Sequence, residues 1–282
     1  MLRISEISFP GLGIGNFTVD SVAFSIGKLT IAWYALFITL GMICAVLYTI
    51  YRAKKIGLKT DDIIDYALAL IPFGIVGARL YYVLAEIDRY HSFMDVINIR
   101  NGGLAIYGGI IAGFIAAVVV SYVKKIPFLA FADTCTPGII LAQSIGRWGN
   151  FMNGEAYGGK TDIFIRMGLS NGNSYSDFGV RDMVYVHPTF LYESLWNLLG
   201  FVLINIFYKH KKYDGQILFF VFGWYALGRM LIEGLRTDSL YSKIFGIEFR
   251  TSQVLAGAIL AVCLGFIIYF QIKKPKKELF KR

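Results

Sequence analysis

Seven apolar runs, each long enough or nearly long enough to cross a bilayer as a helix, dominate this 282-residue sequence. A helix rises about 1.5 Å per residue, so about 20 residues span roughly 30 Å of hydrocarbon. With 56% hydrophobic and 17% charged residues, the composition agrees, because soluble domains are about 25% charged. We therefore predict an all-α polytopic membrane protein, with residues 1–282 forming a single integral membrane domain. The runs lie roughly at 31–51, 63–83, 104–123, 128–146, 189–208, 215–232 and 252–272.

The fourth run is the weakest of the seven. Asp133, Pro137, Gln143 and Ser144 interrupt it. We expect a helix that is kinked or that borders a cavity. A protein with six spans is the alternative.

Positive charge is distributed unevenly between the two sets of alternate loops. The segments after runs one, three, five and seven hold 15 of the 28 Lys and Arg residues, in short stretches of chain. Because cytoplasmic loops of membrane proteins are enriched in Lys and Arg, the N-terminus is predicted outside and the C-terminus in the cytoplasm. Six spans would break this agreement between alternate loops.

Two segments outside the runs are predicted to lie on the outer side. Residues 1–30 are expected to follow the membrane surface, with no signal peptide ahead of the first run. The connection at 147–188 is the longest, and its part at 160–186 is rich in Gly, Asn, Ser and Asp. Because long loops often carry function, we expect a small external cap there.

A polar stretch follows the fourth run directly. Residues 146–159 read Gly-Arg-Trp-Gly-Asn-Phe-Met-Asn-Gly-Glu-Ala-Tyr-Gly-Gly. Polar groups in hydrocarbon are costly unless they are paired or hydrated, and irregular backbone is tolerated there only beside protein or a watery cavity. The stretch therefore predicts a lined site.

Other polar residues lie near the outer ends of the runs in this orientation. Alone, each has a structural explanation: Arg79 could extend to the interface, and Arg229 with Glu233 could form a helix-end ion pair. Together they predict one shared site in a cavity of the outer leaflet, enclosed by the helices. The residues are Tyr34, Arg79, Tyr107, Arg147, Asn150, His187, Tyr192, Glu193, Tyr225, Arg229 and Glu233.

Arginines give this candidate site its chemistry. Arg79, Arg147 and Arg229, with Arg236 just beyond the sixth run, carry forked donors suited to a phosphate or carboxylate. Asparagines and glycines of the polar stretch add neutral donors and let the backbone approach a ligand. An anionic lipid headgroup is the ligand that this set favours.

Neither a metal nor another cofactor is expected. Cys44, Cys135 and Cys263 fall singly in separate runs, and the three histidines are scattered. No metal-ligand spacing arises, so the cysteines are interpreted as small core residues. The positive residues behind the net charge of +9 gather in alternate loops, as they do in membrane proteins of fixed orientation, and this argues against a nucleic-acid partner.

Two other functions would use similar residues. A transporter or flippase for an anionic lipid or small anion would need a polar path through both membrane halves, and the inner half is mostly apolar. An intramembrane protease or hydrolase would need a Ser-His pair or a close aspartate dyad, and neither is evident.

Three motifs resemble the bacterial prolipoprotein diacylglyceryl transferase family. Gly-Arg-x-Gly-Asn-Phe-x-Asn-Gly-Glu-x-x-Gly matches residues 146–158, His-Pro-Thr/Ser-x-Leu-Tyr-Glu matches 187–193, and Tyr-x-x-x-Arg-x-x-x-Glu-x-x-Arg matches 225–236. Tyr34, Arg79 and the element at 102–109 extend the similarity over about residues 33–238. The family's architecture also has seven spans.

The resemblance implies a reaction and its participants. The diacylglyceryl group of phosphatidylglycerol would pass to the thiol of the lipobox cysteine in a prolipoprotein signal peptide, leaving a thioether and glycerol 1-phosphate. This is the first step of bacterial lipoprotein maturation, and it would take place in the plasma membrane among membrane lipids, without a cofactor.

The resemblance also implies site residues. We predict that Arg147 and Arg229 hold the phosphate, that Glu155 and Glu233 orient them, and that Tyr107 takes part in catalysis. Many family members have His where this chain has Tyr107, so the proton acceptor stays open between Tyr107, a water it holds, and His187. The predicted binding residues are Arg147, Asn150, Asn153, Gly154, Gly158, Tyr34, Arg79, His187, Tyr192, Glu193, Tyr225 and Arg236.

Overall fold

The computed structural model describes residues 4–27, 29–90, 92–99, 102–237, 241–244 and 247–273. Among these residues, seven helices are long and apolar enough to cross a membrane, which confirms the all-α, seven-span prediction over the six-span alternative. The basic residues at 274–282, part of the orientation argument, lie outside the described residues, as does His91. The seven are α1 (Trp33–Lys54), α2 (Thr60–Ala85), α4 (Ile106–Lys124), α5 (Phe128–Met152), α7 (Thr189–Phe207), α8 (Gln216–Glu233) and α9 (Thr251–Lys273).

Helix α5 extends further than the sequence predicts. It passes through Pro137 and ends at Met152, where the prediction ended the run at residue 146 and began an irregular loop at 147. The first half of the polar stretch is therefore helical, and the loop starts at Asn153. Gly149 is typical of a loop in the sequence, but in the structure it lies in the helix and faces α1. A Cβ at this position would lie 2.7 Å from the Tyr34 ring of α1. Glycine in a helix allows a close approach between helices.

The described chain forms two compact units. The first contains the residues up to Ala45 and those from Thr136 onward, and the second runs from Val46 to Cys135. Helices α1 and α5 each contribute to both units.

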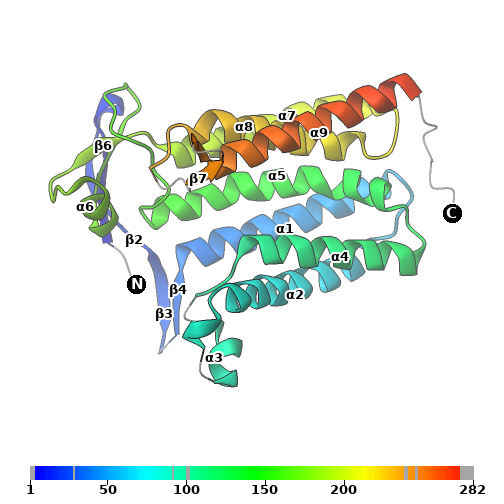
Figure 1. Ribbon diagram of the computed structural model, residues 1–282, viewed down its shortest axis with the longest axis horizontal. Coiled ribbons are helices and arrows are strands. Elements are labelled where there is room, and N and C mark those ends of the chain that lie inside the picture. Colours follow the sequence, from blue (N-terminus) through cyan, green and yellow to red (C-terminus); the bar gives the residue numbers. More distant parts are fainter. Residues whose placement is uncertain are drawn as a thin grey trace. The chain divides into compact units, whose positions relative to one another are not determined.

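Helices α2 and α4 pack closely in the second unit (Figure 1). A Cβ at Gly77 would lie 2.6 Å from the Gly108 carbonyl oxygen, and one at Gly108 would lie 2.2 Å from that of Gly77. Small residues at such a contact let two backbones approach, which is how membrane helices gain packing energy without a hydrophobic driving force. On the same helices, Lys124 pairs with Asp62 at 3.1 Å and also with Asp65.

Helices α7, α8 and α9 lie side by side in the first unit (Figure 1). Trp196 of α7 and Trp224 of α8 stack with ring centroids 4.4 Å apart, and each indole donates to the other's carbonyl oxygen at 3.0 and 2.9 Å. Gly200 and Gly228 leave room for the two rings, because a Cβ at either would lie 2.3 Å from an indole nitrogen. This contact fixes the register of α7 against α8.

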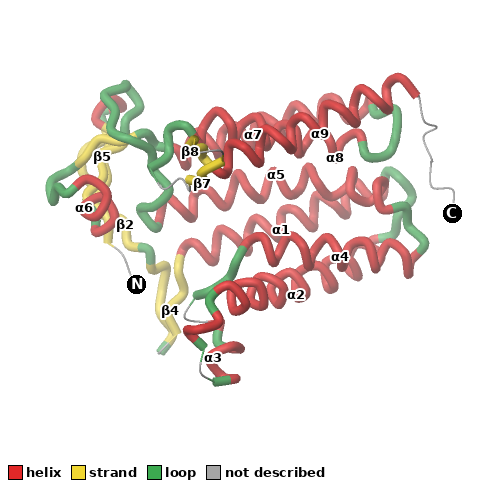
Figure 2. The backbone as a smooth tube through the Cα atoms, in the orientation of Figure 1, coloured by secondary structure: helices red, strands yellow, loops and turns green. Residues whose placement is uncertain are grey.

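A four-stranded antiparallel sheet belongs to the first unit (Figure 2). Its order is β2 (Ile14–Asp20), β1 (Ile4–Phe9), β5 (Met167–Ser170) and β6 (Val184–Val186), with Ile7 opposite both Phe17 and Leu169. The sequence prediction placed residues 1–30 along the membrane surface and gave residues 4–20 no pairing partner. They instead pair with the long loop, because the apolar side of β1 needs cover: Ile7 and Leu169 are fully buried, in a cluster that includes Phe190 of α7.

Short elements complete the described chain. The β3–β4 hairpin runs into α1 and the β7–β8 hairpin into α9. Their bounds are β3 (Val22–Ile26), β4 (Leu29–Ala32), β7 (Tyr241–Ile244), β8 (Ile247–Arg250), α3 (Phe93–Ile97), α6 (Gly172–Phe178), η1 (Pro10–Leu12), η2 (Ile87–Arg89) and η4 (Tyr208–His210).

Candidate active site

Glu193, on the second turn of α7, pairs with three arginines. Its Oε1 lies 2.9 Å from a terminal nitrogen of Arg236, and its Oε2 lies 3.5 Å from one of Arg229 and also pairs with Arg147. The Glu193 side chain is only 6% exposed. Guanidinium groups from α5, from α8 and from the segment after α8 therefore meet at one buried carboxylate.

A second carboxylate completes this group. Glu233, with its side chain 2% exposed, pairs with Arg229 at 2.6 Å one turn along α8. The arginine cluster, defined as Arg147, Arg229, Arg236, Glu193 and Glu233, thus holds one more positive than negative charge. In a partly dry place such an excess attracts an anion strongly, because charges interact more strongly there than in water.

Asn150 and Asn153 connect the cluster to Glu155, which lies outside it. One terminal nitrogen of Arg147 lies 3.4 Å from Asn150 Oδ1, and Asn150 Nδ2 donates to Glu155 Oε1 at 3.1 Å. Asn153 Nδ2 donates to the same Glu155 oxygen at 3.0 Å. The amide of Asn150 therefore has its oxygen toward a cation and its nitrogen toward an anion. Glu155 can orient Arg147 through this asparagine.

The turn after α5 needs unusual backbone conformations. Gly154 and Ala156 both have φ of +57°. This region suits glycine, and for an alanine it costs roughly 1–2 kcal/mol. The Thr189 hydroxyl at the start of α7 donates to the Ala156 carbonyl oxygen. The strained residue thus lies inside the family-like motif, held by the next helix.

Gly158 lies where only glycine fits. A Cβ there would lie 2.7 Å from both the His187 Cβ and the Leu235 carbonyl oxygen. The Gly158 N–H donates to the His187 carbonyl at 2.9 Å, and the Gly159 N–H donates to the Leu235 carbonyl at 2.8 Å. The motif therefore runs between the start of α7 and the end of α8, the helices that carry Glu193 and Arg229.

His187 and Tyr192 lie beside each other at the start of α7. His187 Nδ1 lies 3.2 Å from the Tyr192 hydroxyl. Partial burial lowers the pKa of His187, because it disfavours the charged imidazolium. At neutral pH the ring is therefore uncharged and able to accept a proton.

Tyr34 and Tyr225, the other two tyrosines of the first unit that the sequence predicts for the site, lie on α1 and α8. Tyr34, on the first turn of α1, packs against Gly149 of α5, one residue from Asn150. Tyr225 is half-buried on α8, one turn before Arg229.

Three further residues of this region escaped the sequence prediction. Asn171 Nδ2 donates to the Gly154 carbonyl and to Ser5 Oγ, both at 2.9 Å, which connects β1 to the turn. Arg250 donates to the Glu233 carbonyl oxygen. The Asn-x-x-Ser pattern at 171–174, which is typical of a helix N-cap, could have indicated Asn171. Arg250 gives no such signal, because in the sequence it resembles any charged residue next to a membrane span.

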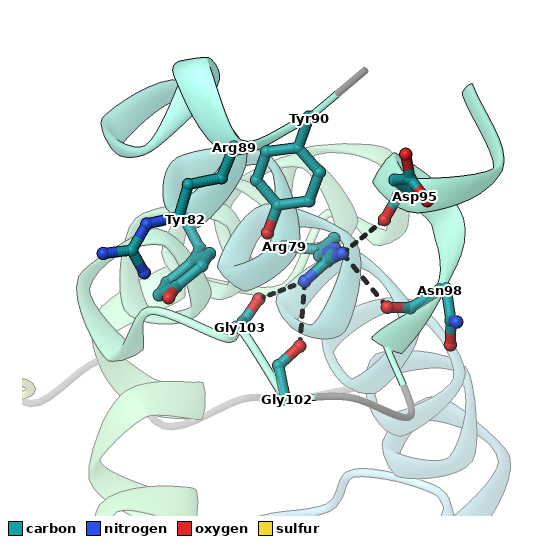
Figure 3. Close-up of a pocket in the computed structure, with 8 residues that line it drawn as sticks. All are labelled: Arg79, Tyr82, Arg89, Tyr90, Asp95, Asn98, Gly102 and Gly103. Carbon is teal, nitrogen blue, oxygen red and sulfur yellow. Dashed lines mark hydrogen bonds between the residues drawn. The ribbon is translucent and has the colours of Figure 1, made fainter. Parts of the chain in front are cut away.

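The guanidinium of Arg79, in the second unit, donates hydrogen bonds to backbone carbonyl oxygens (Figure 3). It lies in the wall of a pocket of about 220 Å³, and the Tyr90 ring lies 5.1 Å from it. The arrangement wraps the loop between α2 and α4 around one side chain. The five acceptors, at 2.7–3.0 Å, are the carbonyls of Asp95, Val96, Asn98, Gly102 and Gly103.

Tyr107 also belongs to the second unit. It lies on the first turn of α4, with 53% of its surface exposed. Within the first unit, the structure brings predicted residues of α5, α7 and α8 together around Glu193. Among the described residues, Tyr192 and Tyr225 have no hydrogen bond to this cluster. That Arg79 and Tyr107 share their site stays a prediction.

Among the described residues, seven apolar helices define a polytopic membrane protein, in which a cluster of arginines surrounds two buried glutamates. A family model described as prolipoprotein diacylglyceryl transferase matches residues 21–269. The chain belongs to this family.

Curated relatives match nearly the whole chain. Phosphatidylglycerol–prolipoprotein diacylglyceryl transferase 1 of Clostridium perfringens is 45% identical, over 93% of this chain and 99% of its own length. Transferases with the same name but without the number, from Listeria welshimeri and Clostridioides difficile, are each 41% identical, over 93% and 92% of this chain and 94% and 98% of their own lengths.

Proposed function

We propose that this bacterial membrane protein transfers the diacylglyceryl group of phosphatidylglycerol to the lipobox cysteine of prolipoproteins. Membership of the family supports the transferase activity and its two substrates. One structural observation carries the assignment of the site: three guanidinium groups, one from α5 and two from the end of α8 and the residues after it, converge on Glu193. Such a cluster suits the phosphate of an anionic lipid.

Arg147 and Arg229 are the residues that we assign to the phosphate. Each has further donors besides those it uses on Glu193, and both side chains remain about 20% exposed, at 20% and 19%. Glu233 orients Arg229 directly, and Glu155 orients Arg147 through Asn150. A lipid phosphate would therefore meet donors that are already in position.

The cluster then stabilises the departing group. The cysteine thiolate attacks the glyceryl carbon next to the phosphate, a C–S bond forms, and the C–O bond breaks with its electron pair on oxygen. Glycerol 1-phosphate leaves with the negative charge. A preorganised donor aimed at such charge is typically worth about 3 kcal/mol.

The thiol must lose its proton for this attack. A free thiol has a pKa of about 8.5 and is mostly protonated at neutral pH, and nearby arginines lower that pKa. His187 is uncharged at neutral pH and is one candidate acceptor. Tyr107, or a water that it holds, is the other.

We also propose the orientation that the loop charges indicate. The N-terminus and the sheet lie outside, the C-terminus lies in the cytoplasm, and the arginine cluster faces the outer leaflet of the plasma membrane. The sheet then forms the external cap. Reagents that label cysteines from outside only, applied to single-cysteine variants in the sheet, test this side assignment.

A reconstitution experiment tests the activity. Purified protein is incubated with headgroup-labelled phosphatidylglycerol and a lipobox peptide. We expect the peptide to gain the mass of a diacylglyceryl group while labelled glycerol phosphate is released in equal amount. A peptide with serine in place of the cysteine is the control. Release of the headgroup without peptide modification would contradict transfer.

A further inference from the structure

A polar pocket lies against the turn that follows α5. It has a volume of about 260 Å³ and lies between this turn and helix α6. The residues that line it are Glu155, Ala156, Tyr157, Asn173, Ser176, Asp177 and Thr237.

Two lining residues connect this pocket to the arginine cluster. Glu155 accepts from Asn150, which in turn contacts Arg147. Thr237 directly follows Arg236, and its hydroxyl donates to the Tyr157 carbonyl oxygen at 3.4 Å. A group bound in the pocket would therefore lie next to an anion held by the cluster.

The lining chemistry suits an uncharged group with several hydroxyls. The described residues that line the pocket include two carboxylates and no basic side chain. Both carboxylates already accept neutral donors: Asp177 from the Tyr157 hydroxyl at 2.7 Å, and Glu155 from two asparagine amides. A second phosphate would be repelled. Hydroxyls can donate to the carboxylate oxygens and accept from the amide of Asn173 and the hydroxyl of Ser176.

We propose that this pocket binds the terminal glycerol of the phosphatidylglycerol headgroup while the arginine cluster holds its phosphate. The inference rests on the proposed function. The bond that breaks, between the diacylglyceryl carbon and a phosphate oxygen, occurs in every glycerophospholipid. Selection of phosphatidylglycerol must therefore come from the group beyond the phosphate, which is a diol.

The test compares two lipids in one protein preparation. Phosphatidylpropanol has the same phosphate and acyl chains but lacks both hydroxyls of the terminal glycerol. If two hydrogen bonds are lost, kcat/KM should fall roughly 10- to 100-fold relative to phosphatidylglycerol. In Ser176→Leu, a larger apolar side chain fills the pocket. The ratio of kcat/KM for phosphatidylglycerol to that for phosphatidylpropanol should then fall to about threefold, because only kcat/KM for phosphatidylglycerol decreases.

Tyr175→Leu is the matched control. Tyr175 lies on the same helix, is exposed, and is not among the residues that line the pocket, so its variant should keep the full preference. The ratio of two lipids in one preparation is independent of how much enzyme is folded.

Three outcomes would decide against the pocket. They are equal use of both lipids by the unaltered protein, an unchanged preference in Ser176→Leu, or faster use of phosphatidylethanolamine than of phosphatidylglycerol. Absence of transfer from every lipid would instead contradict the proposed function.

Discussion

The two units satisfy their buried and partly buried arginines in different ways. Arg79 donates to backbone carbonyls, which are fixed by the path of the chain. Arg147, Arg229 and Arg236 pair with the side-chain carboxylate of Glu193, which can rotate. An arginine on carbonyls holds a loop in place. Arginines that share one carboxylate can exchange part of that pairing for another anion while the backbone keeps its shape.

The two sites also differ in how the positive charge of their arginines is balanced. Carbonyls stabilise the Arg79 guanidinium as dipoles and leave its charge uncancelled, but five contacts occupy its donors. The cluster cancels two of its three charges with Glu193 and Glu233. The remaining charge can be matched by a phosphate. We therefore expect the cluster to bind the ligand and Arg79 to hold its loop in place.

Removal of an arginine from the cluster should have the largest effect on transfer. In Arg147→Ala or Arg229→Ala, kcat should fall about 10²- to 10³-fold, because a preorganised donor to the leaving phosphate is lost. Membrane insertion should be unaffected. Transfer by the purified variants measures this. The control is Arg181→Ala, which removes an exposed arginine that lies over the Tyr175 ring and should keep full activity. Near-normal transfer by both cluster variants would show that Arg147 and Arg229 have no part in the mechanism.

Glu193→Gln tests whether the shared carboxylate organises the cluster. The amide keeps the shape but removes the charge that three guanidiniums share, so they should repel one another and move apart. We expect kcat to fall about 100-fold, within the range for misplaced catalytic groups, with KM for phosphatidylglycerol unchanged or lower, since the site becomes more positive. A raised KM with normal kcat would show that Glu193 acts in another way.

The sequence predicts the spans and the composition of the cluster because both depend on local signals. Apolar length defines a membrane helix by itself. Arg229 and Glu233 lie one turn apart on α8, so their ion pair follows from helical spacing. The charged and amide residues of the motif, from Arg147 to Glu155, lie close along the chain and interact as neighbours.

The rest depends on contacts between distant segments, which no local pattern encodes. The meeting of Arg147 and Arg236 at Glu193 joins three parts of the chain. The pairing of β1 with β5 was missed because a short strand shows its partner only through the surface that it must bury. The end of α5 was placed too early because its polar residues resemble a loop.

Tyr107→Phe tests the other residue of the second unit for which the sequence predicts a role in catalysis. If the hydroxyl or its water accepts the thiol proton, kcat should fall about tenfold, less than for a full general base, because solvent can take over. The pH dependence of kcat should also change. Unchanged turnover and an unchanged pH profile would show that this hydroxyl has no chemical role.

Arg79→Ala should reduce stability more than it reduces catalysis. Loss of the guanidinium leaves five carbonyls without their donors, and we expect the free energy of unfolding to fall by about 3 kcal/mol. Arg79→Lys, with three donors at most, should recover part of it. The unfolding temperature in detergent and the specific activity of the folded fraction measure the two effects. Unchanged stability with lost transfer would place Arg79 at the substrate.

The smallest expected effect concerns His187 and pH. Burial lowers its pKa in the folded protein, so the unfolded chain binds the proton more readily, and stability should fall as pH drops below the ordinary value of about 6.5. Above that value the effect is absent. His187→Gln should flatten this part of the dependence of unfolding temperature between pH 7.5 and 5. If the slope is the same in both proteins, other groups carry it, and the case for His187 as an uncharged acceptor in the site weakens accordingly.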